Sequence, residues 1–155
     1  MTNQYYPTTD VDRIVVETGD TRVDVTKVRT PTGERIQIEH DDLGQIRLDA
    51  VELEALTWQD EAFFADLVDG EYDYRNVDPR PKSAADLQVS NEYALARLRG
   101  SDDGAGVSLT APKMGYGIGI DARVLAAVVT RPKTFFSELL RTPYGPDDDD
   151  DVHVF

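Results

Sequence analysis

The sequence contains an internal duplication, and this duplication limits what the chain can fold into more than any other feature does. Shifting the sequence by 72 residues aligns 46–72 with 118–144 without a gap. Nine aligned pairs are identical, where chance gives about two. The identical pairs are Ile46/Ile118, Asp49/Asp121, Ala50/Ala122, Leu53/Leu125, Ala55/Ala127, Phe63/Phe135, Phe64/Phe136, Leu67/Leu139 and Tyr72/Tyr144. Such similarity predicts two copies of one structural unit.

Each copy begins with segments in which apolar and polar residues alternate, which is the period of a half-buried strand. Turn residues such as Pro31-Thr32-Gly33 and Asp102-Asp103-Gly104 separate these segments. We therefore expect a three-stranded antiparallel meander in each copy. The predicted strands are 22–28, 35–39 and 45–48 in the first copy, and 93–98, 107–109 and 118–120 in the second.

Two short helices are predicted to follow each meander. Asp49 and Asp121 stand at N-cap positions before the first helices, 50–57 and 122–129, whose apolar residues recur at helical spacing. The second helices carry Phe63-Phe64 and Phe135-Phe136 on one apolar stripe. Strands followed by helices in each copy predict an α+β fold.

A unit of about 60 residues buries too little apolar surface to be comfortably stable on its own. We therefore expect the copies to cover each other with pseudo-twofold symmetry, as in a dimer fused into one chain. The predicted layout is a flexible N-terminus (1–14), repeat unit 1 (15–72), a Pro-containing linker (73–88), repeat unit 2 (89–145) and an acidic disordered tail (146–155). The interface between the copies is called the seam below.

The composition excludes several classes of function. The chain has 30 acidic and 16 basic residues, a net charge of −14, and no cysteine. Such a surface repels phosphate backbones, and without cysteine there is no disulfide, thiol nucleophile or cysteine zinc site. Excess carboxylate with scarce lysine is typical of proteins from extreme halophiles. No apolar run is long enough to span a membrane, so we expect a soluble, cytoplasmic protein, either a monomer with an internal pseudo-dimer or a homodimer.

The most enzyme-like string is 114–119, where glycine occupies positions 115, 117 and 119. A dinucleotide fingerprint needs a strand, then the glycines, then a helix. The equivalent residues of the first copy form an ordinary turn that leads into a strand, so this string is interpreted as a structural hairpin. No metal-binding or nucleophile motif is present, and we expect no cofactor and no metal.

Four residues are the candidates for a site at the seam: Arg47, Asp49, Trp58 and Asp121. The two aspartates recur in both copies, and a pair of carboxylates near a symmetry axis could act as acid and base. N-capping explains both without any chemistry. Trp58 is the single tryptophan and stands where the second copy has Thr130, so it is either a core residue or an asymmetric binding group.

The stretch 46–59, with Phe63-Phe64, resembles a pattern in small acidic haloarchaeal proteins of unknown function, some automatically labelled dihydrodiol dehydrogenase. The resemblance covers chiefly the first copy. A dehydrogenase needs a nicotinamide or flavin pocket, and this chain has neither the length nor the glycine loop for one.

Two functions stay open at this point. The favoured hypothesis is a non-enzymatic protein-binding or assembly module of a halophile, whose partner is another protein and neither nucleic acid nor a membrane. The alternative is a small enzyme or small-ligand sensor with its site at the seam. A nucleic-acid regulator would need a basic face from Arg22, Arg29, Arg97 and Arg99, and these lie among acidic neighbours.

Overall fold

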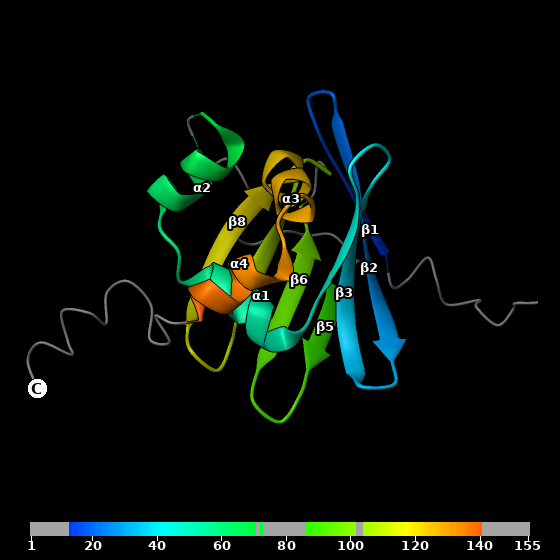
Figure 1. Ribbon diagram of the computed structural model, residues 1–155, viewed down its shortest axis with the longest axis vertical. Coiled ribbons are helices and arrows are strands. Elements are labelled where there is room, and N and C mark those ends of the chain that lie inside the picture. The colour runs from blue at the N-terminus through cyan, green and yellow to red at the C-terminus, as the bar shows by residue number, and fades with distance from the viewer. Residues whose placement is uncertain (1–12, 71, 73–85, 102–103, 141–155) are drawn as a thin grey trace, which may run out of the picture.

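The computed structural model describes residues 13–70, 72, 86–101 and 104–140, which form two four-stranded antiparallel sheets and four helices (Figure 1). The first half contains β1 (Arg13–Thr18), β2 (Thr21–Thr30), β3 (Gly33–His40), β4 (Gly44–Leu48), α1 (Ala50–Thr57) and α2 (Glu61–Val68). The second half contains β5 (Asp86–Ser90), β6 (Leu95–Gly100), β7 (Gly106–Ala111), β8 (Tyr116–Asp121), α3 (Ala122–Val129) and α4 (Lys133–Leu139). The halves therefore share one element order, as the duplication predicts.

Each sheet is a meander of four strands, where the sequence pattern predicted three. The predicted strands correspond to β2–β4 and β6–β8, and the additional strands are β1 and β5. β1 takes residues 13 and 14 out of the predicted flexible N-terminus, and β5 begins at Asp86, inside the predicted linker. Tyr93, predicted to begin a strand, lies in the β5–β6 turn and is 75% exposed.

The first helices lie at the predicted positions because their N-caps are encoded locally. The Asp49 side chain accepts a hydrogen bond from the Glu52 N–H, and the Glu52 carboxylate accepts one from the Asp49 N–H, which completes a capping box. Asp121 accepts from the N–H groups of Arg123 and Val124. Pro132 is the N-cap of α4 and provides no side-chain hydrogen bond to the helix.

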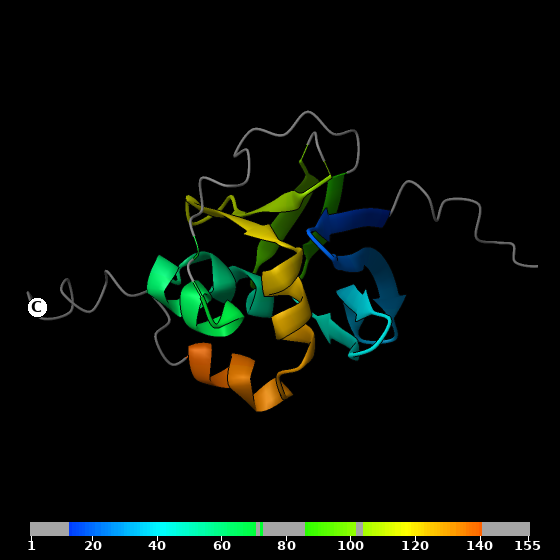
Figure 2. The same cartoon turned by 90° about the horizontal axis from the view of Figure 1, so that it is seen from above.

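The first helix of each half packs on the sheet of the other half. α1 contacts β6, β7 and β8, whereas α3 contacts β1 to β4. The second helices also contact across the seam, α2 against α3 and α4 against α1. Figure 2 shows the two sheets at an angle, with the helices inside that angle.

The core lies between the inner faces of the sheets and these helices. Alternate strand residues, among them Val23, Val25, Ile36 and Ile38, point inward and are almost completely buried. Phe64 of α2 and Phe136 of α4 are fully buried. Burial of this apolar surface is the main stabilising contribution to folding, and neither half could achieve it alone, because the helices of one half cover the sheet of the other.

Most of the predicted linker, residues 1–12 of the predicted flexible N-terminus, and the whole predicted acidic tail lie outside the described residues. Among the helices that the structure does describe, none is both long and apolar enough to cross a membrane.

Candidate functional site

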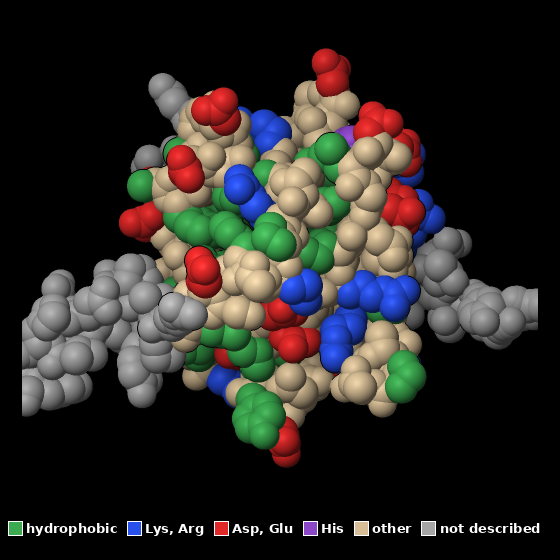
Figure 3. Space-filling view, in the orientation of Figure 1, with side chains coloured by type: hydrophobic (Ala, Val, Ile, Leu, Met, Phe, Trp, Pro, Cys, Tyr) green, Lys and Arg blue, Asp and Glu red, His purple; other side chains and the backbone are tan. Residues whose placement is uncertain are grey.

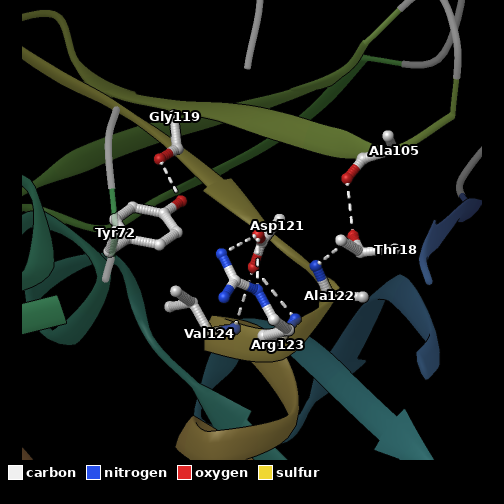
Figure 4. Close-up of polar contacts among 8 residues, drawn as sticks. All are labelled: Thr18, Tyr72, Ala105, Gly119, Asp121, Ala122, Arg123 and Val124. Atoms are coloured by element: carbon white, nitrogen blue, oxygen red, sulfur yellow. Dashed lines mark hydrogen bonds and ion pairs between the residues drawn. The ribbon is translucent and has the colours of Figure 1, made fainter. Parts of the chain in front are cut away.

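Asp121 lies at the seam, at the junction of β8 and α3 (Figure 4). Its side chain is 5% exposed and accepts hydrogen bonds from the Arg123 guanidinium at 3.0 and 2.9 Å, besides the two backbone N–H groups that it caps. The same guanidinium lies 5.6 Å from the ring centroid of Tyr72, which belongs to the first half. The Tyr72 hydroxyl donates to the Gly119 carbonyl at 2.6 Å. Asp121 is thus a buried, paired carboxylate held among contacts between the halves.

A second set of hydrogen bonds joins the end of β1 to the other half beside Asp121 (Figure 4). The Thr18 hydroxyl donates to the Ala105 carbonyl at 2.8 Å and accepts from the Ala122 N–H at 2.9 Å. The Glu17 N–H donates to the Gly104 carbonyl at 2.9 Å. Thr18 therefore connects two segments of the second half through one hydroxyl.

Arg47 and Asp49 lie at the edge of the first sheet, where β4 leads into α1. The Arg47 Nε donates to the Gln37 side-chain oxygen at 2.9 Å. The Lys133 ammonium of α4 donates to the Arg47 carbonyl and to the Glu52 carboxylate, both at 2.7 Å. This lysine ties the second half to the capping box of α1.

Trp58 is the C-cap residue of α1 and is 6% exposed. Its ring packs edge to face on Tyr116 of β8, with 6.4 Å between the ring centroids. The indole N–H is buried and has no hydrogen-bond partner among the described residues. Trp58 is therefore a core residue of the seam with one unsatisfied donor.

Within the described residues, no hydrogen bond, ion pair or ring contact joins one of the four candidate residues to another. Asp49 and Trp58 cap opposite ends of α1, a helix of 8 residues that spans about 12 Å. Each aspartate has its own helix to cap, and each pairs with groups close to it in sequence. A catalytic pair of Asp49 and Asp121, one possibility raised by the duplication, finds no support in these contacts.

Aromatic side chains fill the space between α2 and α4. Phe63 stacks on Phe135 with 5.9 Å between centroids, and each also contacts the adjacent buried phenylalanine of its own helix edge to face. Stacked and edge-to-face pairs stabilise such contacts beyond simple burial. This part of the seam is packed as a hydrophobic core.

Two glutamates of the first half hold the β5–β6 hairpin of the second, and the sequence analysis missed both. Glu34 of β3 accepts from the Ser90 N–H at 3.1 Å, and Glu54 of α1 accepts from the Leu95 N–H at 3.0 Å. Ser90 and Leu95 are paired across that hairpin. Glu54 is 7% exposed although it is charged. An acidic residue at a core-facing position of the α1 pattern was the one available signal.

The electrostatic surroundings of Glu34 favour its ionised form. Partial burial would raise the pKa of this carboxyl, but the Ser90 N–H, Lys27 and Arg29 together lower the pKa below its ordinary value. Lys27 is 3.3 Å and Arg29 3.9 Å from the carboxylate. Glu34 therefore combines a contact across the seam with a small cluster of charges.

A depression of about 110 Å³ on the first sheet is lined by Arg22, Asp24, Glu39 and Asp41. Arg22 and Arg13 already pair with Asp24 there. No group of three or more potential metal-ligating side chains occurs within the described ranges.

Comparison with known proteins adds no identification. No protein-family model matches the chain, and no curated protein matches it. The function must therefore be argued from the contacts above.

Proposed function

We propose that this chain is a non-enzymatic protein-binding or assembly module that binds its partner through an outer surface. The observation that carries the proposal is that the candidate seam residues already have structural contacts. Asp49 and Asp121 cap helices, Arg47 joins β4 to β3, and Trp58 packs on Tyr116. With these residues engaged in the packing of the two halves, the outer faces of the two sheets are left for recognition.

The reciprocal helix contacts support a pseudo-twofold arrangement of two copies. α1 and α3 each pack on the sheet of the other half, and α2 and α4 each contact the first helix of the other half. A single copy would leave its inner sheet face without a helix. Single-copy relatives should accordingly be homodimers.

Composition supports a cytoplasmic protein from a salt-rich cell. Molar salt shortens the Debye length to about 3 Å and so screens the repulsion within a chain of net charge −14. Loss of folded structure on dilution into low salt, followed by circular dichroism, is the expected behaviour of a halophilic protein. Full stability in low salt would contradict a halophilic origin.

The test of the proposed function compares the wild type with the double variant Asp49→Asn/Asp121→Asn. Asparagine caps helices about as well as aspartate, so this variant keeps the fold but lacks both carboxylates. We expect both proteins to retain the same partners in affinity purification from molar KCl, and the same cross-links to the outer sheet faces. Turnover of a substrate by the wild type that is lost in the double variant would overturn the proposal.

The alternative, a small-ligand sensor at the seam, is favoured by one observation. The Trp58 indole N–H is buried and has no partner in the part of the chain that the structure describes, so a ligand oxygen could accept its hydrogen bond. Because Trp58 is the single tryptophan, a ligand bound there would shift the fluorescence of the whole protein. A metabolite panel that shifts the wild-type emission and also raises its melting temperature would support this alternative.

A further inference from the structure

The chain carries a concentrated basic surface in spite of its large negative charge. What we call the basic surface consists of five side chains from β2, β3, β4 and α4: Lys27, Arg29, Arg35, Arg47 and Lys133. Figure 3 shows Lys and Arg side chains gathered over the end of the first sheet that carries the β2–β3 turn, with Asp and Glu side chains at its other end.

The basic surface wraps around this end of the first sheet and has members on both faces. Lys27 and Arg29 share the inner face with buried Ile36. Arg35 and Arg47 lie on the outer face. Lys27 and Arg29 both approach the Glu34 carboxylate, and the Arg35 guanidinium donates to the Glu34 carbonyl at 2.9 Å. Lys133 donates to the Arg47 carbonyl at 2.7 Å. Lys133 belongs to the second half, so it joins the other four residues only when the two halves are packed together.

Two arginines of this surface have no carboxylate partner, which distinguishes them from most arginines that the structure describes. Arg35 bonds only to the Thr32 hydroxyl and the Glu34 carbonyl, and Arg47 only to the Gln37 amide oxygen, within the described part of the chain. On the second sheet, by contrast, Arg97 and Arg99 lie 3.6 and 3.4 Å from the carboxylate of Asp86. Arg35 and Arg47 donate only to neutral oxygen atoms, although the chain is rich in acidic residues. Their remaining guanidinium N–H groups can therefore donate to a carboxylate of another molecule.

The spacing of these two arginines fits an extended acidic peptide. Arg47 is paired with Gln37 across β3 and β4, and Arg35 lies two residues from Gln37 on the same face, so the arginines are diagonal neighbours. Diagonal neighbours lie about 7–8 Å apart, and side chains at positions i and i+2 of an extended chain lie about 7 Å apart. The spacing of two carboxylates on one extended segment therefore matches the spacing of the two backbone positions that carry these arginines.

We propose that the basic surface binds an extended segment of a partner protein that is rich in Asp and Glu, with Arg35 and Arg47 holding two of its carboxylates. This inference rests on the proposed function and deepens it by naming the partner class. A nucleic acid fits less well, because β2, β3 and β4 carry no Phe, Tyr or Trp on which bases could stack.

The experiment uses the full chain and a fluorescein-labelled poly-aspartate peptide, followed by fluorescence anisotropy at the lowest KCl concentration that keeps the chain folded. The test variant is Arg35→Gln/Arg47→Gln, and the matched control is Arg97→Gln/Arg99→Gln, which removes the same charge from the second sheet. We expect the test variant to bind about tenfold or more weakly for the loss of charge-assisted hydrogen bonds, and the control to bind within about twofold of wild type. Circular dichroism confirms that both variants remain folded.

Other results would overturn the inference in distinguishable ways. Equal binding by both variants would place the peptide elsewhere, and would leave the proposed function standing. No binding to the wild type would exclude an acidic partner segment at this surface. Binding that emerges only after removal of residues 146–155 would make the chain's own acidic tail the occupant. Equally tight, Arg35-dependent binding of a single-stranded oligonucleotide would show that the surface recognises phosphate instead of carboxylate.

Discussion

Replacing Glu34 by glutamine tests whether a charged contact across the seam contributes to stability. The glutamine carbonyl can still accept the Ser90 N–H, so the variant loses the charge assistance of that bond and the ion pair with Lys27 at 3.3 Å. Charge assistance contributes about 0.5–1 kcal/mol, and a partly exposed ion pair up to about 1 kcal/mol. Arg29, 3.9 Å away with its side chain 79% exposed, adds little. We expect a loss of about 1 kcal/mol in the free energy of unfolding at neutral pH.

The pH dependence of this loss gives the sharper result. The folded state lowers the pKa of Glu34 from its ordinary value of 4.5, so the stabilisation is fully present above that pH. It is lost as the pH falls through the lower pKa of the folded protein, because protonated glutamate resembles glutamine. The two unfolding free energies should therefore converge in acid.

Urea unfolding of both proteins, followed by circular dichroism from neutral pH into acid at constant KCl, measures this difference. Glu39→Gln is the matched control, since Glu39 is exposed on the same strand and faces the other side of the sheet. That control should change stability little and without a pH trend. A Glu34→Gln difference that is absent at neutral pH, or that stays constant into acid, would refute the reasoning.

Three further substitutions test local contacts by the same measurement. Asp121→Ala should cost about 1–2 kcal/mol through the lost N-cap and the unpaired Arg123 guanidinium, whereas Asp121→Asn should cost distinctly less; equal losses would mean that capping is not its role. Trp58→Phe should change stability by less than about 1 kcal/mol, because relief of the unsatisfied indole N–H offsets the lost apolar area; a much larger loss would reveal a hidden partner of that donor. Gly115→Ala should cost about 1 kcal/mol, because Gly115 has a φ of +78° with no atom within 4 Å of an added Cβ; an unchanged stability would show that this turn tolerates an L residue.

The interpretation of the glycine string shows how far the duplication could guide the analysis. The structure confirms a hairpin there: Gly115 lies in the β7–β8 turn and residues 117–119 lie within β8. The comparison with the first copy was decisive, because a glycine pattern alone does not distinguish a phosphate loop from a turn. Internal similarity here served as evidence about local backbone structure.

Local sequence signals specify most of the helices and strands of this protein. The helices at 50–57 and 122–129 were predicted with their observed bounds, because caps and apolar spacing act between neighbouring residues. β5 was missed although Leu87 and Val89 alternate with polar residues, because the first part of this strand was assigned to the predicted linker. Three strands per copy were thus predicted where four are present.

Tertiary structure alone decided which surfaces meet. An apolar face shows that a helix must be covered, but it does not say by which sheet, and here α1 and α3 each pack on the sheet of the other half. The contacts between the halves at the seam were likewise decided by tertiary structure. Neither Glu34 on the Ser90 N–H nor Trp58 on Tyr116 could be predicted, because these partners lie far apart in sequence. Hydrophobic burial is non-directional, so the pattern of one segment does not encode its distant partner.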